Sequence, residues 1–238
     1  MSLDEFSQHK GQGHYVTTVV DLDHASLLEV IDSHQQEELI AALTALYPVA
    51  ERLAVEEVSI DMWASYTTVV TTVFPQATIV YDRFHVMQHV NRELNRLRKQ
   101  MKVKFKGAPH LLWKHHQDLD DDQRARLRQG LKDHPCLAIA YDLKEELYTL
   151  YETARSVNGA QRQLRRWLRI ARLLYADSAV MIERHLEGIC QYFAHHTTSE
   201  ITEGINTRIK LIKRQGYGFP CFPHFRLRLL VVIQRSVG

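Results

Sequence analysis

Cysteine, long apolar runs and internal repeats are all scarce in this sequence. Its 238 residues contain three cysteines, which lie far apart and form no CxxC pair, at Cys136, Cys190 and Cys221. This spacing excludes a disulfide framework and a thiolate zinc site. The 14 histidines likewise show no metal-binding spacing. No stretch recurs with a period of about 20 to 50 residues, so a solenoid is not expected.

Signals for membrane insertion and secretion are also missing. No apolar run approaches the length of a membrane span, and the N-terminus, MSLDEFSQHK, lacks the apolar core of a signal peptide. We therefore expect a cytoplasmic protein. What the sequence does have is an ordinary globular composition, with 45% hydrophobic and 24% charged residues. Its length suits one large domain, or one domain that carries an insertion.

Positive charge is segregated along the chain, although the net charge is only +2. Segments 83–106, 160–175 and 201–228 contain eight, five and six Lys or Arg residues, against one, zero and one acidic residues. A polyanion-binding surface needs such clusters, because phosphate contacts depend on local charge. The alternative is that these segments are basic helices with solvated faces.

Short β-strand signals alternate with helical patterns in the first third of the chain. Residues 15–21 (YVTTVVD) are rich in β-branched side chains, which favour a strand. The patterns together predict strands at 2–6, 15–21, 26–31, 57–60 and 77–81, and helices at 35–47 and 66–73. The order β-β-β-α-β-α-β indicates an α/β fold, a ribonuclease H-like mixed sheet with flanking helices.

Helical periodicity dominates from Phe84 onward for about a hundred residues. In the first of these helices Arg92, Arg96 and Lys99 line one face. After a loop at 107–109, further helices are predicted from a cap at Asp118 to Leu131, and at 135–157, 159–175 and 178–195. We therefore expect a ribonuclease H-like core in two parts, 1–102 and 197–238, separated by a large all-α insertion at 103–196. The tail at 216–228 is turn-rich and aromatic, and it leads into an apolar run at 229–233.

The helix predicted at residues 198–214 has two chemically distinct faces. Its apolar stripe consists of Ile201, Ile205, Ile209 and Ile212. The opposite face carries Glu203, Thr207, Lys210 and Arg214, flanked by Asn206 and Lys213. One carboxylate among an amide and several cations suits a group that shares a metal ion beside a phosphate backbone. A solvated face with i,i+4 pairs is the alternative interpretation.

Three acidic residues stand where the predicted sheet would gather them. Asp61 ends the strand at 57–60, Asp4 lies on the first strand, and Glu203 lies on the late helix. In the ribonuclease H-like order the first and fourth strands are neighbours, so Asp4 and Asp61 are expected to face each other. Three carboxylates there would coordinate Mg²⁺ or Mn²⁺. A pair of such ions, about 3.5 to 4 Å apart, serves an in-line phosphoryl displacement.

Each of these acids also has a local alternative. An Asp at a strand end is common, as at Asp4, Asp61 suits a helix N-cap, and Glu203 suits the first turn of a helix. Asp82 competes with Asp61 as a metal ligand, because it also ends a strand, and Arg83 and His85 follow it. We prefer Asp61 because the fifth strand lies one place further from the first strand. His85 either orients a substrate or a carboxylate, or is a core histidine.

Several segments of the chain resemble one protein family. The segments LDEFSQHKGQGHYVTTVVDLD, VSIDMWASYTTVV, ATIVYDRFHVMQHVNRELNRLRKQ and TSEITEGINTRIKLIKRQGYGF are similar to the catalytic domain of bacterial insertion-sequence transposases of the ISL-three group. The resemblance implies a DDE triad at Asp4, Asp61 and Glu203 with divalent metal. It also implies DNA cleavage at the element ends and transfer of the freed 3′ hydroxyl to target DNA.

The resemblance extends to partners and to DNA contacts. It implies that a homo-oligomer assembles on DNA, without a membrane, in the cytoplasm of a bacterium near the nucleoid. The helical insertion would hold DNA or a second subunit. The expected DNA-binding residues are Asn206, Lys210, Lys213 and Arg214 on the late helix, and Arg83, His85, Arg92, Arg96 and Lys99 on the helix from Phe84.

One departure from the family concerns the N-terminus. Members usually carry a cysteine-rich and helix-turn-helix region that recognises the element ends, whereas only Met1, Ser2 and Leu3 precede Asp4 here. We therefore expect a chain truncated at the N-terminus and without sequence-specific end binding. Two alternatives to an active transposase domain remain at this stage. One is a catalytically inactive remnant that binds DNA non-specifically, and the other is a ribonuclease H-like nuclease that only hydrolyses.

Overall fold

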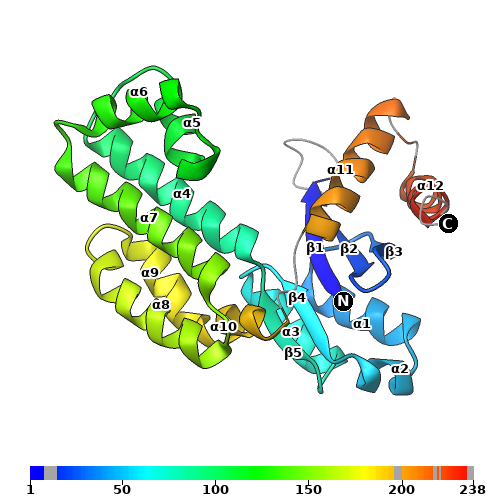
Figure 1. The fold of residues 1–238 in the computed structure, drawn as a ribbon. Helices are drawn as coiled ribbons and strands as arrows, with labels where there is room; N and C mark the ends of the chain where they lie inside the picture. The colour runs from blue at the N-terminus through cyan, green and yellow to red at the C-terminus, as the bar shows by residue number, and fades with distance from the viewer. Residues whose placement is uncertain (8–14, 196–199, 217–218, 220, 235–238) are drawn as a thin grey trace. The chain divides into compact units, whose positions relative to one another are not determined.

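The computed structural model describes residues 1–7, 15–195, 200–216, 219 and 221–234 (Figure 1). The chain divides into two compact units, one formed by residues 1–82 with 197–238 and the other by residues 83–196. The first unit is a sheet with helices, and the second is all α. The predicted domain boundary at residue 102 stays a prediction. No helix in the described ranges is long and apolar enough to cross a membrane.

The first unit is built on a five-stranded mixed sheet with the order β3-β2-β1-β4-β5. The strands are β1 (Ser2–Ser7), β2 (Tyr15–Asp21), β3 (Ser26–Ile31), β4 (Glu57–Ile60) and β5 (Thr78–Tyr81). The first three form an antiparallel meander, whereas β4 is parallel to β1 and β5 is parallel to β4. This arrangement confirms the predicted ribonuclease H-like α/β fold.

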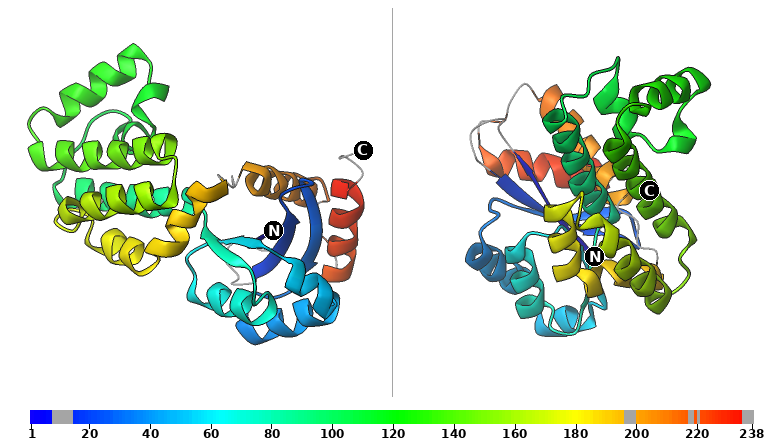
Figure 2. Two further views of the ribbon diagram at one scale, coloured as in Figure 1. Left: turned by 60° about the horizontal axis from the view of Figure 1, so that its bottom comes forward. Right: turned by 90° about the vertical axis from the view of Figure 1, so that its left-hand side faces the viewer.

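Helices cover both faces of this sheet (Figure 2). They are α1 (Gln36–Leu46), α2 (Val49–Ala54), α3 (Ala64–Val73), α11 (Glu200–Gln215) and α12 (Phe222–Gln234). Side chains of a strand alternate between the two faces. On β2, Val16 and Val20 therefore pack in one cluster with α11 and α12. Thr17 points to the other face, where its hydroxyl lies 3.2 Å from the hydroxyl of Tyr66 on α3.

Helix α12 occupies part of the tail for which the sequence suggested turns. Pro223 is the second residue of this helix, where a proline is tolerated because no intrahelical partner exists for its missing N–H. Phe225, Leu229 and Ile233 follow at helical spacing and are buried against the sheet. Arg226 on the same helix donates from Nε to Glu29 Oε1 of β3, at 2.5 Å. Pro223 therefore lies in the first turn of a helix, where the sequence had suggested a turn-rich tail.

The second unit consists of helices joined by short connections. They are α4 (Arg83–Gln100), α5 (Ala108–Trp113), the 3₁₀ turn η1 (His116–Asp118), α6 (Asp121–Leu131), α7 (Pro135–Thr153), α8 (Val157–Ala171), α9 (Ala176–Arg184) and α10 (Leu186–His195).

Three details of this unit differ from the sequence-based expectation. The cap of α6 is Asp120, which forms a capping box with Gln123, rather than Asp118. The loop expected at 107–109 begins α5. The single helix expected at 178–195 is divided at His185 into α9 and α10.

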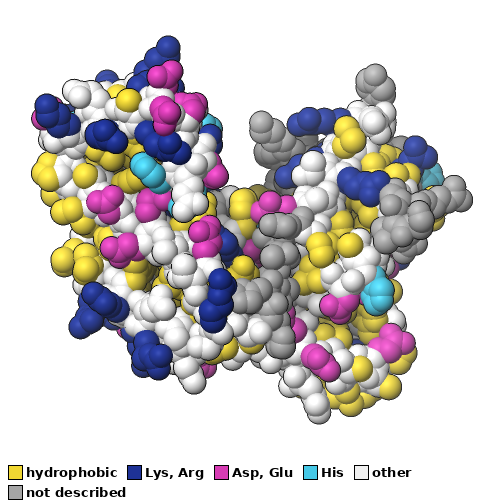
Figure 3. Space-filling model, in the orientation of Figure 1, with side chains coloured by type: hydrophobic (Ala, Val, Ile, Leu, Met, Phe, Trp, Pro, Cys, Tyr) yellow, Lys and Arg dark blue, Asp and Glu magenta, His cyan; other side chains and the backbone are white. Residues whose placement is uncertain are grey.

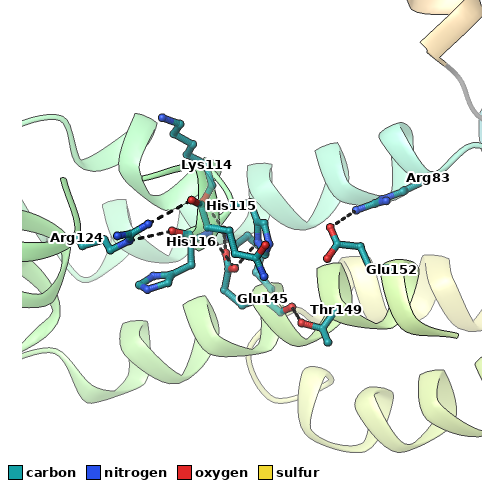
Figure 4. Close-up of polar contacts among 10 residues, drawn as sticks. Arg83, Lys114, His115, His116, Arg124, Glu145, Thr149 and Glu152 are labelled. Carbon is teal, nitrogen blue, oxygen red and sulfur yellow. Dashed lines mark hydrogen bonds and ion pairs between the residues drawn. The ribbon is translucent and has the colours of Figure 1, made fainter. Parts of the chain in front are cut away.

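A buried polar cluster joins the α5–η1 connection to α7 (Figure 4). Lys144 is fully buried, forms an ion pair with Glu145, and donates from Nζ to the carbonyl oxygen of Lys114 at 2.8 Å. Burial lowers the pKa of the Lys144 ammonium. Burial alone would raise the pKa of Glu145, but the hydrogen bond and positive charge of Lys144, together with the hydrogen bond from the backbone N–H of His116, outweigh it and lower that pKa. Glu145 also accepts from the backbone N–H of His116 at 3.0 Å. The cluster fixes the connection onto α7.

The position of α11 on the sheet depends on apolar packing, which gives a test of stability. Ile209 is fully buried in the α11 stripe, so Ile209→Ala removes packing atoms and leaves a cavity. We expect a loss of about 2 to 5 kcal/mol in the free energy of unfolding of the first unit, measured by urea denaturation. Lys210→Ala changes the exposed neighbouring position and is the control. Equal stability of the two variants would contradict the packing assignment.

Candidate active site

Asp4 and Asp61 belong to neighbouring parallel strands of the sheet. Ser2 of β1 is paired with Ser59 of β4, and the backbone N–H of Ser59 donates to the carbonyl oxygen of Met1 at 2.9 Å. Asp4 lies on β1, two residues after Ser2, and Asp61 directly follows β4, two residues after Ser59. Their meeting at a shared metal ion stays a prediction.

Asp82 lies at the same edge of the sheet but one strand further from β1. Ile60 of β4 is paired with Tyr81 of β5, and the backbone N–H of Asp82 donates to the carbonyl oxygen of Ile60 at 3.1 Å. The observed order confirms that β4 separates β5 from β1, which was the reason for preferring Asp61 over Asp82. The choice between these two carboxylates as metal ligands stays a prediction.

Asp4 connects the sheet to α11. Its Oδ1 accepts from the backbone N–H of Glu5 at 2.8 Å, and its Oδ2 accepts from Nδ2 of Asn206 at 2.5 Å. The amide oxygen of Asn206 is buried and has no hydrogen-bond partner within the described part of the chain. Asn206 therefore places an amide oxygen that could bind a metal ion beside the Asp4 carboxylate. The sequence had suggested this residue as a DNA contact, and no local signal indicated its pairing with Asp4.

The two faces predicted for α11 are confirmed. Ile205, Ile209 and Ile212 are buried in the cluster on the sheet, with Ile201 packed at its margin. Glu203, Thr207, Lys210 and Arg214 are exposed, and Asn206 and Lys213 are half-buried between the faces. Burial lowers the pKa of the Lys213 ammonium. Glu203 lies three residues before Asn206, and residues at this separation are surface neighbours on a helix.

Asp61 is held at the start of the segment that leads into α3. Its Oδ1 accepts from the backbone N–H of Trp63 at 2.9 Å, and Trp63 is the N-cap residue of α3. Asp61 therefore organises the turn before this helix without being its N-cap. Such a short turn fixes the direction of the carboxylate at the end of β4.

The donor set at this edge fits a hard divalent cation. Across the described ranges, no three His, Cys, Asp or Glu side chains lie close enough together to hold a metal ion. The candidate ligands are the carboxylates of Asp4 and Asp61 on and after neighbouring strands, the unsatisfied amide oxygen of Asn206 and Glu203 one turn away on α11. All are oxygen donors, which Mg²⁺ and Mn²⁺ prefer.

The other predicted DNA-binding residues lie on α4 in the all-α unit, where several have local partners. Arg83 lies 3.6 Å from Glu152 and over the rings of Tyr148 and Tyr151. Arg96 forms ion pairs of 2.7 Å with Glu93 and with Asp177. Their contacts with DNA stay predictions.

The remaining predicted residues on α4 differ in exposure. Arg92 is exposed and donates to Oε1 of Gln88 at 2.5 Å. Lys99 is exposed as well. His85 is half-buried, and its ring packs edge-on against Phe84. Their contacts with DNA also stay predictions.

A mixed sheet that gathers carboxylates at one edge below a covering helix is the architecture of ribonuclease H-like nucleotidyl-transfer domains. The sequence model of a transposase family, the ISL3 family of DDE transposases, matches residues 1–229. Because this match covers nearly the whole chain, the chain belongs to the ISL3 transposase family.

Two named relatives agree with this assignment. The chain is 31% identical over 244 residues to the transposase for insertion sequence element IS1001 of Bordetella parapertussis. It is 29% identical over 255 residues to the transposase for insertion sequence element IS1557 of Mycobacterium tuberculosis. These alignments cover 96% and 92% of this chain, but 59% and 56% of the relatives. The chain therefore spans a little over half the length of these proteins.

The hydrogen bond between Asn206 and Asp4 can be tested by placing a second negative charge beside Asp4. Asn206→Asp sets a second carboxylate against Asp4, and this repulsion raises the folded-state pKa of one of the two carboxyls. We expect a loss of roughly 1 to 3 kcal/mol in unfolding free energy at neutral pH. Because the raised pKa lies above the unfolded value, the loss diminishes as the pH falls through it, toward about pH 5. Urea denaturation at the two pH values measures both effects.

The matched control for this substitution is Thr207→Asp. It adds the same charge at the next position of α11, which is exposed. If Asn206→Asp were as stable as Thr207→Asp at neutral pH, the contact with Asp4 would not be present in solution.

Proposed function

We propose that this chain is a DDE transposase catalytic domain that cleaves DNA and transfers the freed 3′ hydroxyl to target DNA. The observation that carries this proposal is the hydrogen bond from Asn206 of α11 to Asp4 of β1, the strand that is parallel to and next to β4, after which Asp61 follows. Membership of the ISL3 family supports the same reaction, and the matched relatives are named as transposases of insertion sequence elements.

In this proposal Asp4, Asp61 and Glu203 hold one or two Mg²⁺ or Mn²⁺ ions. When bound, such ions activate the attacking oxygen and stabilise the charge on the leaving oxygen of a phosphodiester. Asp4 and Asp61 offer ligands of fixed direction, because each accepts a backbone N–H at its Oδ1. Asn206 orients the Asp4 carboxylate from α11.

Glu203 completes the set from the exposed face of α11. Three carboxylates repel one another until a cation is shared between them. A glutamate side chain has the rotamer freedom to relieve this repulsion, whereas the two aspartates are held by strand and turn. We therefore infer that the Glu203 side chain turns toward Asp4 when metal and DNA are bound.

The cations that follow Glu203 on α11 serve the DNA backbone. Lys210 and Arg214 lie about two and three turns further along the exposed face, about 10 and 16 Å from Glu203 along the helix axis. A phosphate strand that passes Glu203 would therefore meet both. Such contacts position DNA without reading its sequence.

Substitution of the carboxylates tests the proposal directly. Glu203→Gln and Asp61→Asn each remove a charged metal ligand, and we expect nicking of supercoiled plasmid in Mn²⁺ to fall by roughly 100-fold or more. Asp82→Asn is the matched control, because it makes the same change at the same sheet edge, and it is expected to keep activity. If Asp82→Asn lost activity and Asp61→Asn kept it, Asp82 would be the metal ligand in place of Asp61. Activity retained in Glu203→Gln would remove Glu203 from the triad.

A strand-transfer assay separates transposition from simple hydrolysis. A labelled oligonucleotide with a free 3′ hydroxyl is incubated with plasmid target, and covalent joining of the two is measured. Nicking without joining would favour the ribonuclease H-like nuclease. DNA binding without nicking by the unsubstituted chain would favour an inactive remnant.

Metal binding is testable without catalysis. An ion that binds only the folded site raises stability by about 2.7 kcal/mol at 100 times its dissociation constant. We expect Mn²⁺ to raise the Tm of the unsubstituted chain and of Asp82→Asn, and to leave Asp4→Asn and Asp61→Asn nearly unchanged. Mg²⁺ and a monovalent salt of equal ionic strength are run in parallel. A Tm shift of equal size in Asp61→Asn would contradict the assigned ligands.

A further inference from the structure

Helix α8 carries the most one-sided charge of the all-α unit. Its sequence, VNGAQRQLRRWLRIA, contains four arginines and no acidic residue, and Arg172 follows as its C-cap. The buried face consists of Ala160, Leu164, Trp167, Leu168 and Ala171. At 100° per residue the arginines fall on the opposite side of the helix. We call Arg162, Arg165, Arg166 and Arg169 the arginine stripe.

The arginine stripe is exposed and lacks acidic partners. All four of its residues are exposed, and none forms an ion pair with a carboxylate anywhere in the described ranges. Arg172, at the end of the helix, does have such a partner, Glu183 at 2.6 Å. Figure 3 shows Lys and Arg side chains over the helices at the lower left, where α8 lies in Figure 1.

The arginine stripe differs from α4 in its acidic partners. On α4, two of the five cations, Arg83 and Arg96, pair with Glu152, Glu93 and Asp177. No member of the stripe has such a pair within the described ranges, although Arg166 lines a cavity that Asp142, Glu145 and Glu146 also line. Arginine also presents a planar fork of donors that matches phosphate oxygens.

We propose that the arginine stripe is a docking surface for the phosphate backbone of duplex DNA. This proposal rests on the proposed function, in which DNA is the substrate. From Arg162 to Arg169 the stripe extends about 10 Å along the helix, which is about three phosphate spacings along the axis of one strand. The contact is independent of base sequence, because it reaches only the backbone.

Other partners fit the stripe less well. An amphipathic helix that lies in a membrane needs a free apolar face, and the apolar face of α8 is buried within its own unit. A protein partner would have to match these arginines with several acidic side chains, because a buried charge left unpaired is costly. A polyanion with regularly spaced charges needs no free apolar face and offers one phosphate to each arginine.

The test uses the whole chain and a duplex oligonucleotide of arbitrary sequence. The variant Arg162→Gln/Arg165→Gln/Arg169→Gln is compared with Arg124→Gln/Arg126→Gln/Arg128→Gln, which removes the same charge from α6 of the same unit. Glutamine keeps the helix propensity of arginine, and circular dichroism verifies folding. We expect the slope of log Kobs against log salt concentration to fall in magnitude by about 2 to 3 for the α8 variant. The α6 control is expected to keep the slope of the unsubstituted chain.

A third variant with Arg162→Lys/Arg165→Lys/Arg169→Lys keeps the charge and is expected to keep most of the slope. Equal slopes for the α8 and α6 glutamine variants would overturn the proposal, and so would loss of self-association in the α8 variant with full DNA affinity. If the unsubstituted chain bound no DNA, the proposed function itself would fail. The same comparison is made in a Glu203→Gln chain. If the α8 substitutions reduce the salt slope of DNA binding there as well, the arginine stripe binds DNA independently of the catalytic triad.

Discussion

The packing of one apolar stripe on the sheet determines where the chemistry of this protein is gathered. Ile205, Ile209 and Ile212 bury one side of α11 against the strands, and burial of such side chains contributes about 1.5 to 3 kcal/mol each. Because a helix is rigid over a few turns, fixing that side also fixes the directions of the others. Asn206 then meets Asp4, and Glu203 is presented one turn away. The polar face alone does not determine this orientation.

The sheet supplies the second half of the same constraint. β1 and β4 are parallel neighbours; Asp4 lies on β1, and the hydrogen bond from the Trp63 backbone holds the Asp61 carboxylate directly after β4. A carboxylate that leaves water is stabilised by a nearby cation or hydrogen-bond donor. The Asn206 amide is such a donor for Asp4. This arrangement agrees with membership of a DDE transposase family.

Strands and the late helix were predictable because their signals are local. Residues 15–21, 26–31 and 57–60 have the predicted bounds as strands, since β-branched residues and turns delimit them. Helix α12 was not predicted, because the prolines at 220 and 223 in the sequence are typical of a turn, although Pro223 occupies a tolerated helical position. The division at His185 between α9 and α10 also lacks a glycine or proline signal. The triad residues and their roles stay predictions.

Long-range pairing is the part that a single sequence does not contain. Asn206 and Asp4 are 202 positions apart, and no periodicity connects them. The same holds for charge: the basic segment 83–106 has eight cations in sequence, yet Arg96 is paired with Asp177 from a helix far along the chain. In segment 160–175 the four cations of the arginine stripe have no ion pair among the described residues, whereas Arg172 pairs with Glu183. The positive charge that a basic helix offers to a polyanion therefore depends on which acids the fold brings to it as well as on the number of its lysines and arginines.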